Sequence, residues 1–357
     1  MFVVPGRLHA RTGGSIYNHR IVSALRARGW AIDVHELDGE FPTPSPDGIA
    51  AAAALLATVG DDTTVVIDGL AYGAMADVVV AASARLRLVA LVHMLLAHEV
   101  GIDRATERQR EADERRALSA ATAVVVTGRT MVDPVSSYGV GIDRIAVVTP
   151  GTDRAPIARG SGRSLVQLLC VAALTLGKGH DVLLRALAAN RDRGWHLTCV
   201  GSATRSASTA AALREMVGAL NLSGRVSFAG ELAGSALDET FDQTDVFVLA
   251  TFRETFGMAV AEALARGIPV VSTATGEIPL LVGTNAGLVV PVGNTEALAA
   301  ALTEVLTDAA FRKTLRNGAI QVRDRLSDWD VAASKMSAVL ERVVDGSSEP
   351  FRGNARE

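Results

Sequence analysis

The sequence predicts an α/β protein made of two doubly wound, Rossmann-like domains, each with a parallel sheet, and three observations support this. The chain has 357 residues, which at roughly 150 residues per domain suggests two domains. Short aliphatic runs alternate with longer helical patterns along the whole chain, as parallel sheets with crossover helices require. The runs are nearly continuous in Val, Ile and Leu, which is typical of strands covered on both faces.

The predicted strands divide into two sets of six. Those of the first half are 2–4, 31–35, 64–67, 87–92, 123–126 and 145–148, with helical segments such as 14–28 and 103–119 between them. Those of the second half are 165–172, 197–201, 226–228, 246–250, 269–272 and 287–290. Ligands of doubly wound folds bind at the carboxyl ends of the strands, so the functional residues are expected where these strands end.

The domain boundary is predicted near residues 150–162, where Pro, Gly and charged residues occur without periodicity. We therefore expect one domain at 1–152 and a second at 153–330. After a polar break, residues 331–345 have a helical pattern. Residues 346–357 are polar and rich in Gly and Ser, so we expect a disordered tail.

Composition excludes several classes of protein. The net charge is −4, so no basic surface for nucleic acid is expected. The longest uncharged apolar run, 48–60, is shorter than the ~18 residues of a membrane span, and the first residues do not resemble a signal peptide. We therefore expect a cytoplasmic protein without a transmembrane segment. Cys170 and Cys199 lie in strand-like runs and are expected to be buried free thiols.

The strongest candidate site begins at the end of the predicted strand 246–250. Phe256, Gly257 and Met258 open the next helix, whose unpaired N–H groups and positive dipole end predict a seat for an anion. Gly257 lacks a side chain where a phosphate must approach the backbone.

Two carboxylates flank this predicted anion seat. Glu262 lies five residues past Gly257, about one and a half turns into the helix. That spacing suits a carboxylate that accepts hydrogen bonds from the ribose hydroxyls attached to a diphosphate. Glu254, on the other side, could hold hydroxyls of the group that the diphosphate carries. The alternative is that both are solvated carboxylates.

This segment resembles the signature of glycosyltransferase family 4, which comprises retaining, nucleotide-sugar-dependent enzymes of GT-B fold. The signature is E-x7-E followed by ALARGIPVV. Four further stretches resemble the family in its order: VPGRLHARTGGSIYNHRIVSALRARGW, LVHMLLAHEVG, VVTPGTD and LTLGKGHDVLLRAL. The resemblance covers nearly the whole chain. It implies two domains that face each other across a cleft, with the helix 331–345 crossing back to the N-terminal domain.

The resemblance also implies how the donor is bound. Lys178 follows a strand and opens a helix, where it would neutralise the charge of a departing nucleoside diphosphate; a solvated lysine is the alternative. The remaining donor-side candidates are glycine loops and a strand end, namely Gly13 and Gly14 near the diphosphate or sugar, Gly276 near the sugar, and Gly230 and Glu231 near the base. The loop 172–177 lacks the Arg that many members place before this Lys.

Two residues of the first half are candidates for the acceptor side. His93 ends the strand 87–92, and the resemblance places it beside the reactive sugar; a histidine hydrogen-bonded at a strand end is the alternative. Arg129 follows the strand 123–126 and could contact the acceptor or a phosphate, or be a surface charge. The candidate catalytic residues are therefore His93, Lys178 and Glu254.

The predicted function is transfer of a hexosyl group from an NDP-sugar to an acceptor hydroxyl, with retention and without a metal. A UDP-sugar is favoured as co-substrate, and no other cofactor is expected. No basic amphipathic helix stands out, so a small-molecule acceptor is favoured over a lipid. The oligomeric state is left open. The alternatives are a nucleotide-sugar epimerase or phosphorylase on the same fold, or a non-catalytic nucleotide-sugar binding protein.

Overall fold

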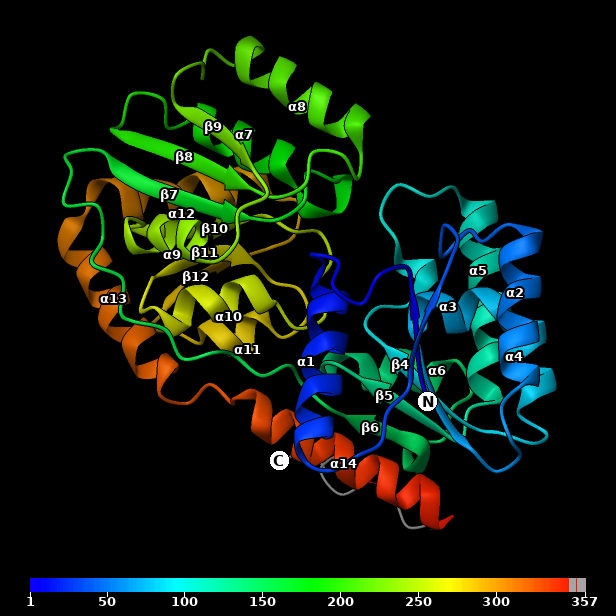
Figure 1. Ribbon diagram of the computed structural model, residues 1–357. Coiled ribbons are helices and arrows are strands. Elements are labelled where there is room, and N and C mark those ends of the chain that lie inside the picture. Colours follow the sequence, from blue (N-terminus) through cyan, green and yellow to red (C-terminus); the bar gives the residue numbers. More distant parts are fainter. Residues whose placement is uncertain (347–350, 352–357) are drawn as a thin grey trace. The chain divides into compact units, whose positions relative to one another are not determined.

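The structure is a computed structural model, and it describes residues 1–346 and residue 351. The chain divides into two compact units (Figure 1). Unit 1 is Met1–Gly151 together with the chain from Ser327 onward, and unit 2 is Thr152–Leu326. The tail expected at 346–357 lies outside the described residues, apart from Gly346 and Phe351.

Unit 1 contains a six-stranded parallel sheet in the order β2-β1-β3-β4-β5-β6. Its strands are β1 (Phe2–Pro5), β2 (Val34–Leu37), β3 (Thr64–Asp68), β4 (Arg87–Val92), β5 (Ala123–Val126) and β6 (Ile145–Val147). The strand predicted at 31–35 was wrong at both ends, because Phe2 of β1 pairs with Val34 and Pro5 pairs with Leu37. Register with β1 therefore places β2 later than its apolar pattern suggests.

Local capping signals set the starts of several helices in unit 1. The side chains of Thr12, Ser45 and Asp103 each accept a hydrogen bond from a first-turn backbone N–H, which satisfies donors that a helix start leaves unpaired. The helices are α1 (Gly13–Ala27), α2 (Pro46–Ala57), α3 (Gly69–Tyr72), α4 (Ala76–Ala82), α5 (Arg104–Ser119), α6 (Val132–Ser137) and α14 (Trp329–Asp345).

Both faces of this sheet are covered by apolar side chains. Val65 and Ile67 of β3 join one buried cluster, whereas Val66 between them joins another. Helices α2 to α6 contribute to the first cluster, and α1 and α14 contribute to the second. Successive strand residues point to opposite faces, so this arrangement explains the unbroken aliphatic runs of the sequence.

The last helix packs on the first within unit 1. α14 contacts α1, and its Met336 and Val339 are buried in the same cluster as Ile21 of α1. The side chain of Asp328 caps α14, and Asp330 forms an ion pair with Arg28 of 2.7 Å. The sheet and first helix of unit 1 are thus completed by a segment from the far end of the chain.

Unit 2 contains a second six-stranded parallel sheet, in the order β12-β11-β10-β7-β8-β9. Its strands are β7 (Val166–Val171), β8 (Trp195–Val200), β9 (Val226–Gly230), β10 (Val246–Leu249), β11 (Val270–Thr273) and β12 (Gly287–Val290). Its helices are α7 (His180–Ala188), α8 (Ala207–Ala219), α9 (Ser235–Asp242), α10 (Met258–Ala265), α11 (Ile278–Val282), α12 (Thr295–Thr307) and α13 (Ala309–Arg323). Within the described chain, no helix has both the length and the apolar character that crossing a membrane requires.

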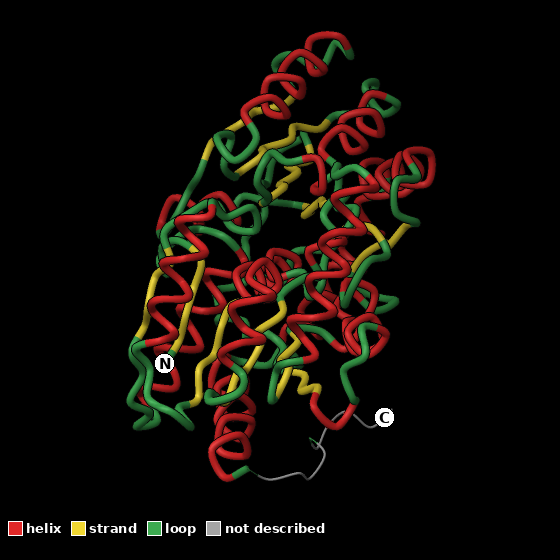
Figure 2. The backbone as a smooth tube through the Cα atoms, turned by 90° about the vertical axis from the view of Figure 1, so that its right-hand side faces the viewer, coloured by secondary structure: helices red, strands yellow, loops and turns green. Residues whose placement is uncertain are grey.

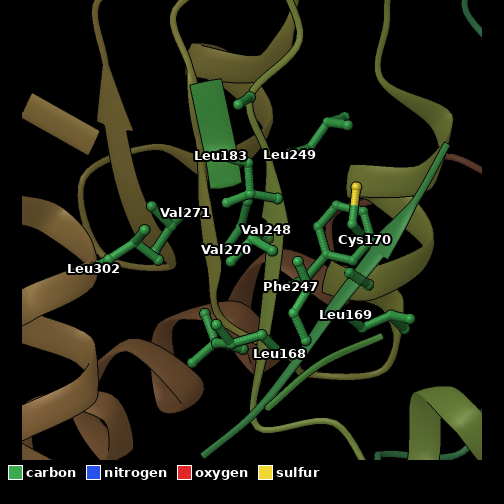
Figure 3. Close-up of a cluster of buried hydrophobic side chains, with 14 of the residues drawn as sticks. Leu168, Leu169, Cys170, Leu183, Phe247, Val248, Leu249, Val270, Val271 and Leu302 are labelled. Carbon is green, nitrogen blue, oxygen red and sulfur yellow. The ribbon is translucent and has the colours of Figure 1, made fainter. Parts of the chain in front are cut away.

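The helices of unit 2 pack in two groups around its sheet. α7 contacts α8 and α12, whereas α10 contacts α11 and α13. Figure 2 shows the strands with helices packed beside them. The central strands bury Leu168, Phe247 and Val270 in one apolar cluster (Figure 3). Cys170 and Cys199 are neighbours on β7 and β8, both buried and free, which confirms the expectation of buried thiols.

In each sheet the order of the strands reverses at one place. In unit 1 the chain passes from β1 to β2 on one side and then to β3 on the other, so the reversal lies between β1 and β3. In unit 2 it lies between β7 and β10. Loops leaving adjacent strands diverge at such a switch point, where ligands of doubly wound folds bind.

Candidate functional site

An ion pair lies at the switch point of unit 2. Lys178 Nζ donates to Glu254 Oε2 at 2.7 Å. Lys178 ends a short 3-10 helix, η5 (Leu176–Lys178), that follows β7, and Glu254 lies in the loop that follows β10. The two side chains are 31% and 21% exposed. The structure therefore brings together two of the three predicted catalytic residues, at a place that ligands can reach.

Close backbone contacts hold the two loops together. The carbonyl of Gly177 accepts hydrogen bonds from Phe252 N at 2.9 Å and from Thr251 Oγ1 at 3.1 Å. Gly179 has a φ of +63°, and a Cβ there would lie 2.0 Å from the carbonyl oxygen of Ala250. Only glycine permits this approach. The ion pair is therefore held by two loops whose backbones pack against each other.

A third loop, after β11, positions the backbone of Glu254. A Cβ on Gly276 would lie 2.0 Å from the carbonyl oxygen of Glu254. The backbone N–H of Glu254 donates to Thr275 Oγ1 at 3.3 Å, and that of Glu277 donates to the carbonyl of Thr255 at 2.9 Å. Gly276, predicted to lie near the donor sugar, is thus in direct contact with Glu254.

The start of α10 provides backbone donors close to this pair in the sequence. Gly257 is the N-cap of α10 with a φ of +96°, and Phe256 lies just before it in the loop, half-buried. In the described part of the chain no side chain caps this helix, and its first turn contains no acidic residue. Its first N–H groups are therefore available to a ligand. Glu262 follows Met258 by about one turn and is also half-buried.

The two residues predicted near the base lie further along the same edge of the sheet. Gly230 ends β9, and its carbonyl accepts a hydrogen bond from the N–H of Gly201 at 2.8 Å. Glu231 follows and is exposed. β9 is separated from β7 by β8. The structure thus places Gly230 and Glu231 on the same edge of the sheet as the ion pair, two strands away from it.

A buried polar network surrounds His93 in unit 1. His93 follows β4, Asp68 ends β3, and Asn18 lies on α1. His93 Nε2 is 3.0 Å from Asn18 Oδ1 and 3.3 Å from Asp68 Oδ2, and Asn18 Nδ2 donates to Asp68 Oδ2 at 2.5 Å. Asn18 and Asp68 are both 2% exposed, whereas the side chain of His93 is 18% exposed. His93 is thus the accessible end of the network.

Asp68 supplies a fixed negative charge beside this histidine. Burial alone would raise the pKa of Asp68. Hydrogen bonds from His93, Asn18 and the backbone N–H of Leu70, together with the charge of His93 when it is protonated, outweigh burial and hold that pKa below its ordinary value. The carboxylate therefore stays ionised at neutral pH.

The other predicted residues of unit 1 lie on the same edge of the sheet. Gly13 and Gly14 are the first residues of α1, and a Cβ on Gly14 would lie 3.2 Å from His93 Cδ2. The predicted glycine loop and His93 are therefore in contact. Arg129 follows β5, the neighbour of β4, and is exposed.

The sequence reasoning missed Asn18 and Asp68. A signal for Asp68 was present, since an acidic residue directly follows the aliphatic run 64–67 where a strand ends. Asn18 lies four residues after Gly14, which places both on one face of the helix. Neither position indicates that the two side chains meet His93, because that contact depends on how α1 packs on the sheet.

Comparison with protein sequences finds a family match within unit 2 and relatives whose matches are longer than that unit. Residues 159–322 match the family described as Glycosyl transferases group 1. A D-inositol 3-phosphate glycosyltransferase from Corynebacterium glutamicum (strain R) is 27% identical over 266 residues, which is 68% of this chain and 63% of that protein. The matched region therefore spans less than two thirds of the relative's length.

Comparison with solved structures defines the fold. Sucrose-phosphate synthase from Thermosynechococcus elongatus has a TM-score of 0.81 at 22% identity, covering 97% of this chain and 99% of that one. Anabaena HepE in complex with UDP and glucose has a TM-score of 0.74 at 16% identity, covering 95% and 99%. The two parallel sheets with their helices thus have the GT-B type of fold, as the sequence resemblance implied.

Proposed function

We propose that this protein is a glycosyltransferase that transfers a hexosyl group from an NDP-sugar, with UDP-sugars as the first candidates, to a hydroxyl of an acceptor. The observation that supports this most is the Lys178–Glu254 pair at the switch point of unit 2. It lies shortly before a helix start that offers uncapped N–H groups. The family match over residues 159–322 covers all of these residues.

The charges of this site suit a sugar diphosphate. The N–H groups at the start of α10 would bind phosphate oxygens, and Lys178 would neutralise the charge that develops on the leaving diphosphate. Glu254, which as a carboxylate only accepts hydrogen bonds, would hold sugar hydroxyls, and Glu262 would hold those of the ribose. Lys178 and the N–H groups at the start of α10 supply positive charge without a bound metal, so we propose metal-independent transfer.

We further propose that the reaction retains the anomeric configuration. In this scheme the bond from the anomeric carbon to the diphosphate oxygen breaks while the bond to the acceptor oxygen forms on the same face. The leaving diphosphate takes the proton of the acceptor hydroxyl. Lys178 stabilises the diphosphate as its charge grows, which is the kind of contribution that counts most when charge develops at a fixed place.

For the acceptor we propose a small, hydroxyl-rich molecule with an anionic group. The name of the Corynebacterium relative contains D-inositol 3-phosphate, a phosphorylated polyol. At the carboxyl edge of the unit 1 sheet, Arg7 follows β1 and Arg129 follows β5, and both are exposed. Two cations at the expected acceptor side favour a phosphate-bearing compound as the first acceptor to test.

The proposal is tested by measuring UDP release from UDP-glucose and other UDP-hexoses with inositol 3-phosphate and unphosphorylated polyols, with products identified by mass spectrometry. We expect release to require both substrates. Lys178→Ala and Glu254→Ala should each lower turnover by about 10²- to 10³-fold, whereas Lys313→Ala, at an exposed position of α13, should not. Wild-type turnover in both site variants would show that the site is assigned wrongly.

The same samples separate the alternatives. An epimerase would convert the UDP-sugar without any acceptor, which NMR spectra of the donor alone would reveal. A phosphorylase would require inorganic phosphate in place of the acceptor. A non-catalytic binding protein would bind the UDP-sugar in calorimetry and release no UDP with any acceptor.

A further inference from the structure

We propose that Asp68 and Asn18 are positioning residues that fix His93 in the tautomer with its proton on Nε2, so that the neutral ring offers Nδ1 as a hydrogen-bond acceptor to a substrate hydroxyl. The contact with substrate rests on the proposed function. The tautomer does not, because it follows from contacts within unit 1 alone.

The proton positions follow from donor and acceptor roles around Asp68. An ionised carboxylate can only accept hydrogen bonds. The atom of Asn18 that lies 2.5 Å from Asp68 Oδ2 must therefore be Nδ2, which turns Oδ1 of the same amide toward His93. An amide oxygen also only accepts, so His93 Nε2, at 3.0 Å, must donate. The 3.3 Å contact between Nε2 and Asp68 Oδ2 requires the same proton.

The packing of the ring determines which atom faces away from α1. A Cβ on Gly14 would lie 3.2 Å from His93 Cδ2 and 3.5 Å from Nε2, so this edge of the ring packs against α1. Nδ1 lies across the ring from that edge. Tyr17 holds the ring in an edge-on contact with centroids 5.2 Å apart, and its own hydroxyl donates to the carbonyl of Val148 at 2.8 Å. The ring is therefore fixed in orientation as well as in tautomer.

This arrangement has a chemical consequence for a sugar or acceptor hydroxyl. With the proton on Nε2, the neutral imidazole can accept a hydrogen bond only at Nδ1. It can thus orient a hydroxyl by accepting its proton in a hydrogen bond. The opposite tautomer would donate from Nδ1, and the hydroxyl would have to turn its lone pair to the ring.

The Asp68→Asn variant provides the first test, since it keeps the shape of the side chain and changes its hydrogen-bonding roles. The N–H of Leu70 donates to Asp68 Oδ1 at 2.9 Å, so the oxygen of the new amide is expected to stay there and its NH2 group to replace Oδ2. Asn18 must then turn its oxygen toward this NH2 group and its own NH2 group toward His93. Nε2 becomes an acceptor, and the proton moves to Nδ1.

The double variant Asn18→Asp/Asp68→Asn exchanges the two side chains. The carboxylate at position 18 would accept from His93 Nε2 and from the new amide at position 68, while Leu70 keeps its acceptor. We therefore expect the double variant to restore the Nε2–H tautomer that Asp68→Asn alone reverses. A merely structural role for Asp68 does not predict this pattern of loss and rescue.

The measurement is the ¹⁵N chemical shift of the ring nitrogens in long-range ¹H–¹⁵N spectra of the full chain at about pH 9, where free imidazole is neutral. The chain has 7 histidines, and the signals of His93 are identified by their absence in His93→Gln. We expect Nε2 to carry the proton in the wild type and the double variant, and Nδ1 to carry it in Asp68→Asn. A wild-type ring protonated on Nδ1, or an unchanged tautomer in Asp68→Asn, would overturn the proposal even if other variants fail to fold.

Turnover tests the contact with substrate. With a UDP-sugar and its acceptor, kcat of Asp68→Asn should fall by about 10- to 100-fold, as for other partners that orient a functional histidine, and recover in the double variant. The KM for the UDP-sugar should change little. An unchanged kcat in a variant with the reversed tautomer would refute the contact with a substrate hydroxyl. The absence of transfer by the wild type would refute the proposed function and leave the tautomer assignment standing.

Discussion

Lys178 is one of only three lysines in a chain with 35 basic residues, and its partner is a carboxylate 76 residues away. A lysine ammonium is a compact charge on a flexible stem. It can therefore leave Glu254 for a phosphate oxygen with little rearrangement. The ion pair therefore holds Lys178 at the place where the proposed diphosphate would bind.

This view predicts that Glu254→Gln separates binding of the nucleotide from transfer of the sugar. Removing the carboxylate charge frees Lys178 and removes a repulsion against the diphosphate, so UDP should bind about 3- to 10-fold more tightly. Transfer should be lost, since the proposed contact of the carboxylate with sugar hydroxyls is changed. Isothermal titration calorimetry with UDP and the turnover assay measure the two effects.

A change of UDP affinity in the opposite direction would also be informative. If UDP bound more weakly to Glu254→Gln, Glu254 would serve to hold Lys178 in place for the nucleotide, and the proposed exchange of partners would be incorrect. Glu304→Gln, on helix α12 outside the site, is the matched change of one carboxylate and should leave UDP binding as it is.

Single residues also show how far the sequence could predict the site. Glu254, Lys178 and His93 each follow a predicted strand, and ends of parallel strands meet at one edge of a sheet. The family resemblance, in addition, was needed to assign roles to Lys178 and His93. The sequence could not indicate that Lys178 bonds directly to Glu254, because the order in which β7 and β10 lie side by side is a property of the sheet. Asn18 and Asp68 were missed for the same reason, since their contact arises only when α1 packs on the sheet.

At the scale of elements, three loops that follow β7, β10 and β11 form one closely packed assembly, and glycines without side chains permit it. Gly276 is the tightest point next to Glu254. We expect Gly276→Ala to destabilise the protein by more than about 3 kcal/mol or to displace the Glu254 loop, since a Cβ would lie 2.0 Å from a backbone oxygen. Thermal unfolding and turnover measure both outcomes.

The Gly224→Ala variant shows how much of the expected stability loss in Gly276→Ala comes from backbone strain and how much from steric crowding. Gly224 has a φ of +79°, and nothing lies within 4 Å of where its Cβ would be. Only the cost of a left-handed conformation, about 1–2 kcal/mol, is expected there. Equal losses of stability in the two variants would mean that strain alone, and not the contact with Glu254, determines the effect of Gly276→Ala.

A second element, α5, is hydrogen-bonded to the loop that follows His93. Glu114 on α5 accepts the backbone N–H groups of Leu96 at 2.8 Å and Ala97 at 3.2 Å. Burial raises the pKa of Glu114 to about 7 against its ordinary value of 4.5, although those N–H groups and Arg110 lower it in part. The folded protein thus holds a proton on Glu114 more tightly than the unfolded chain does.

The sign of the pH dependence follows from this difference. The contribution of Glu114 to stability is fully present below about pH 4.5 and is lost as the pH rises to about 7, by on the order of 3 kcal/mol. Glu114→Gln cannot titrate, so its free energy of unfolding should lack this decline. Urea unfolding of both proteins between pH 4.5 and 8 measures it, and parallel curves would show that Glu114 does not titrate in this range.

At the scale of the whole molecule, the alternation of strand and helix predicted twelve strands, and the described residues form twelve, with β2 displaced from its predicted position. The prediction succeeded because a strand buried on both faces must be aliphatic along its whole length. The pattern could not show which sheet a late helix joins, since an amphipathic helix has the same periodicity wherever it packs. Only the family resemblance implied that the last helix returns to the first domain, and the structure shows that α14 contacts α1 there. Unit 1 is consequently discontinuous in the sequence.

This discontinuity makes unit 1 dependent on residues from the end of the chain. Met336 of α14 is fully buried, in one cluster with Ile21 and Leu25 of α1. Met336→Ala should lower the free energy of unfolding of unit 1 by about 2–4 kcal/mol through the cavity it creates. Hydrogen exchange measured by mass spectrometry should show faster exchange in α1 and β1 and unchanged protection in α7 and β8. Val344→Ala, at a position of α14 that is 48% exposed, should change neither region. Equal loss of protection in both units after Met336→Ala would show that the units unfold as one, in which case α14 would stabilise the whole chain and not unit 1 alone.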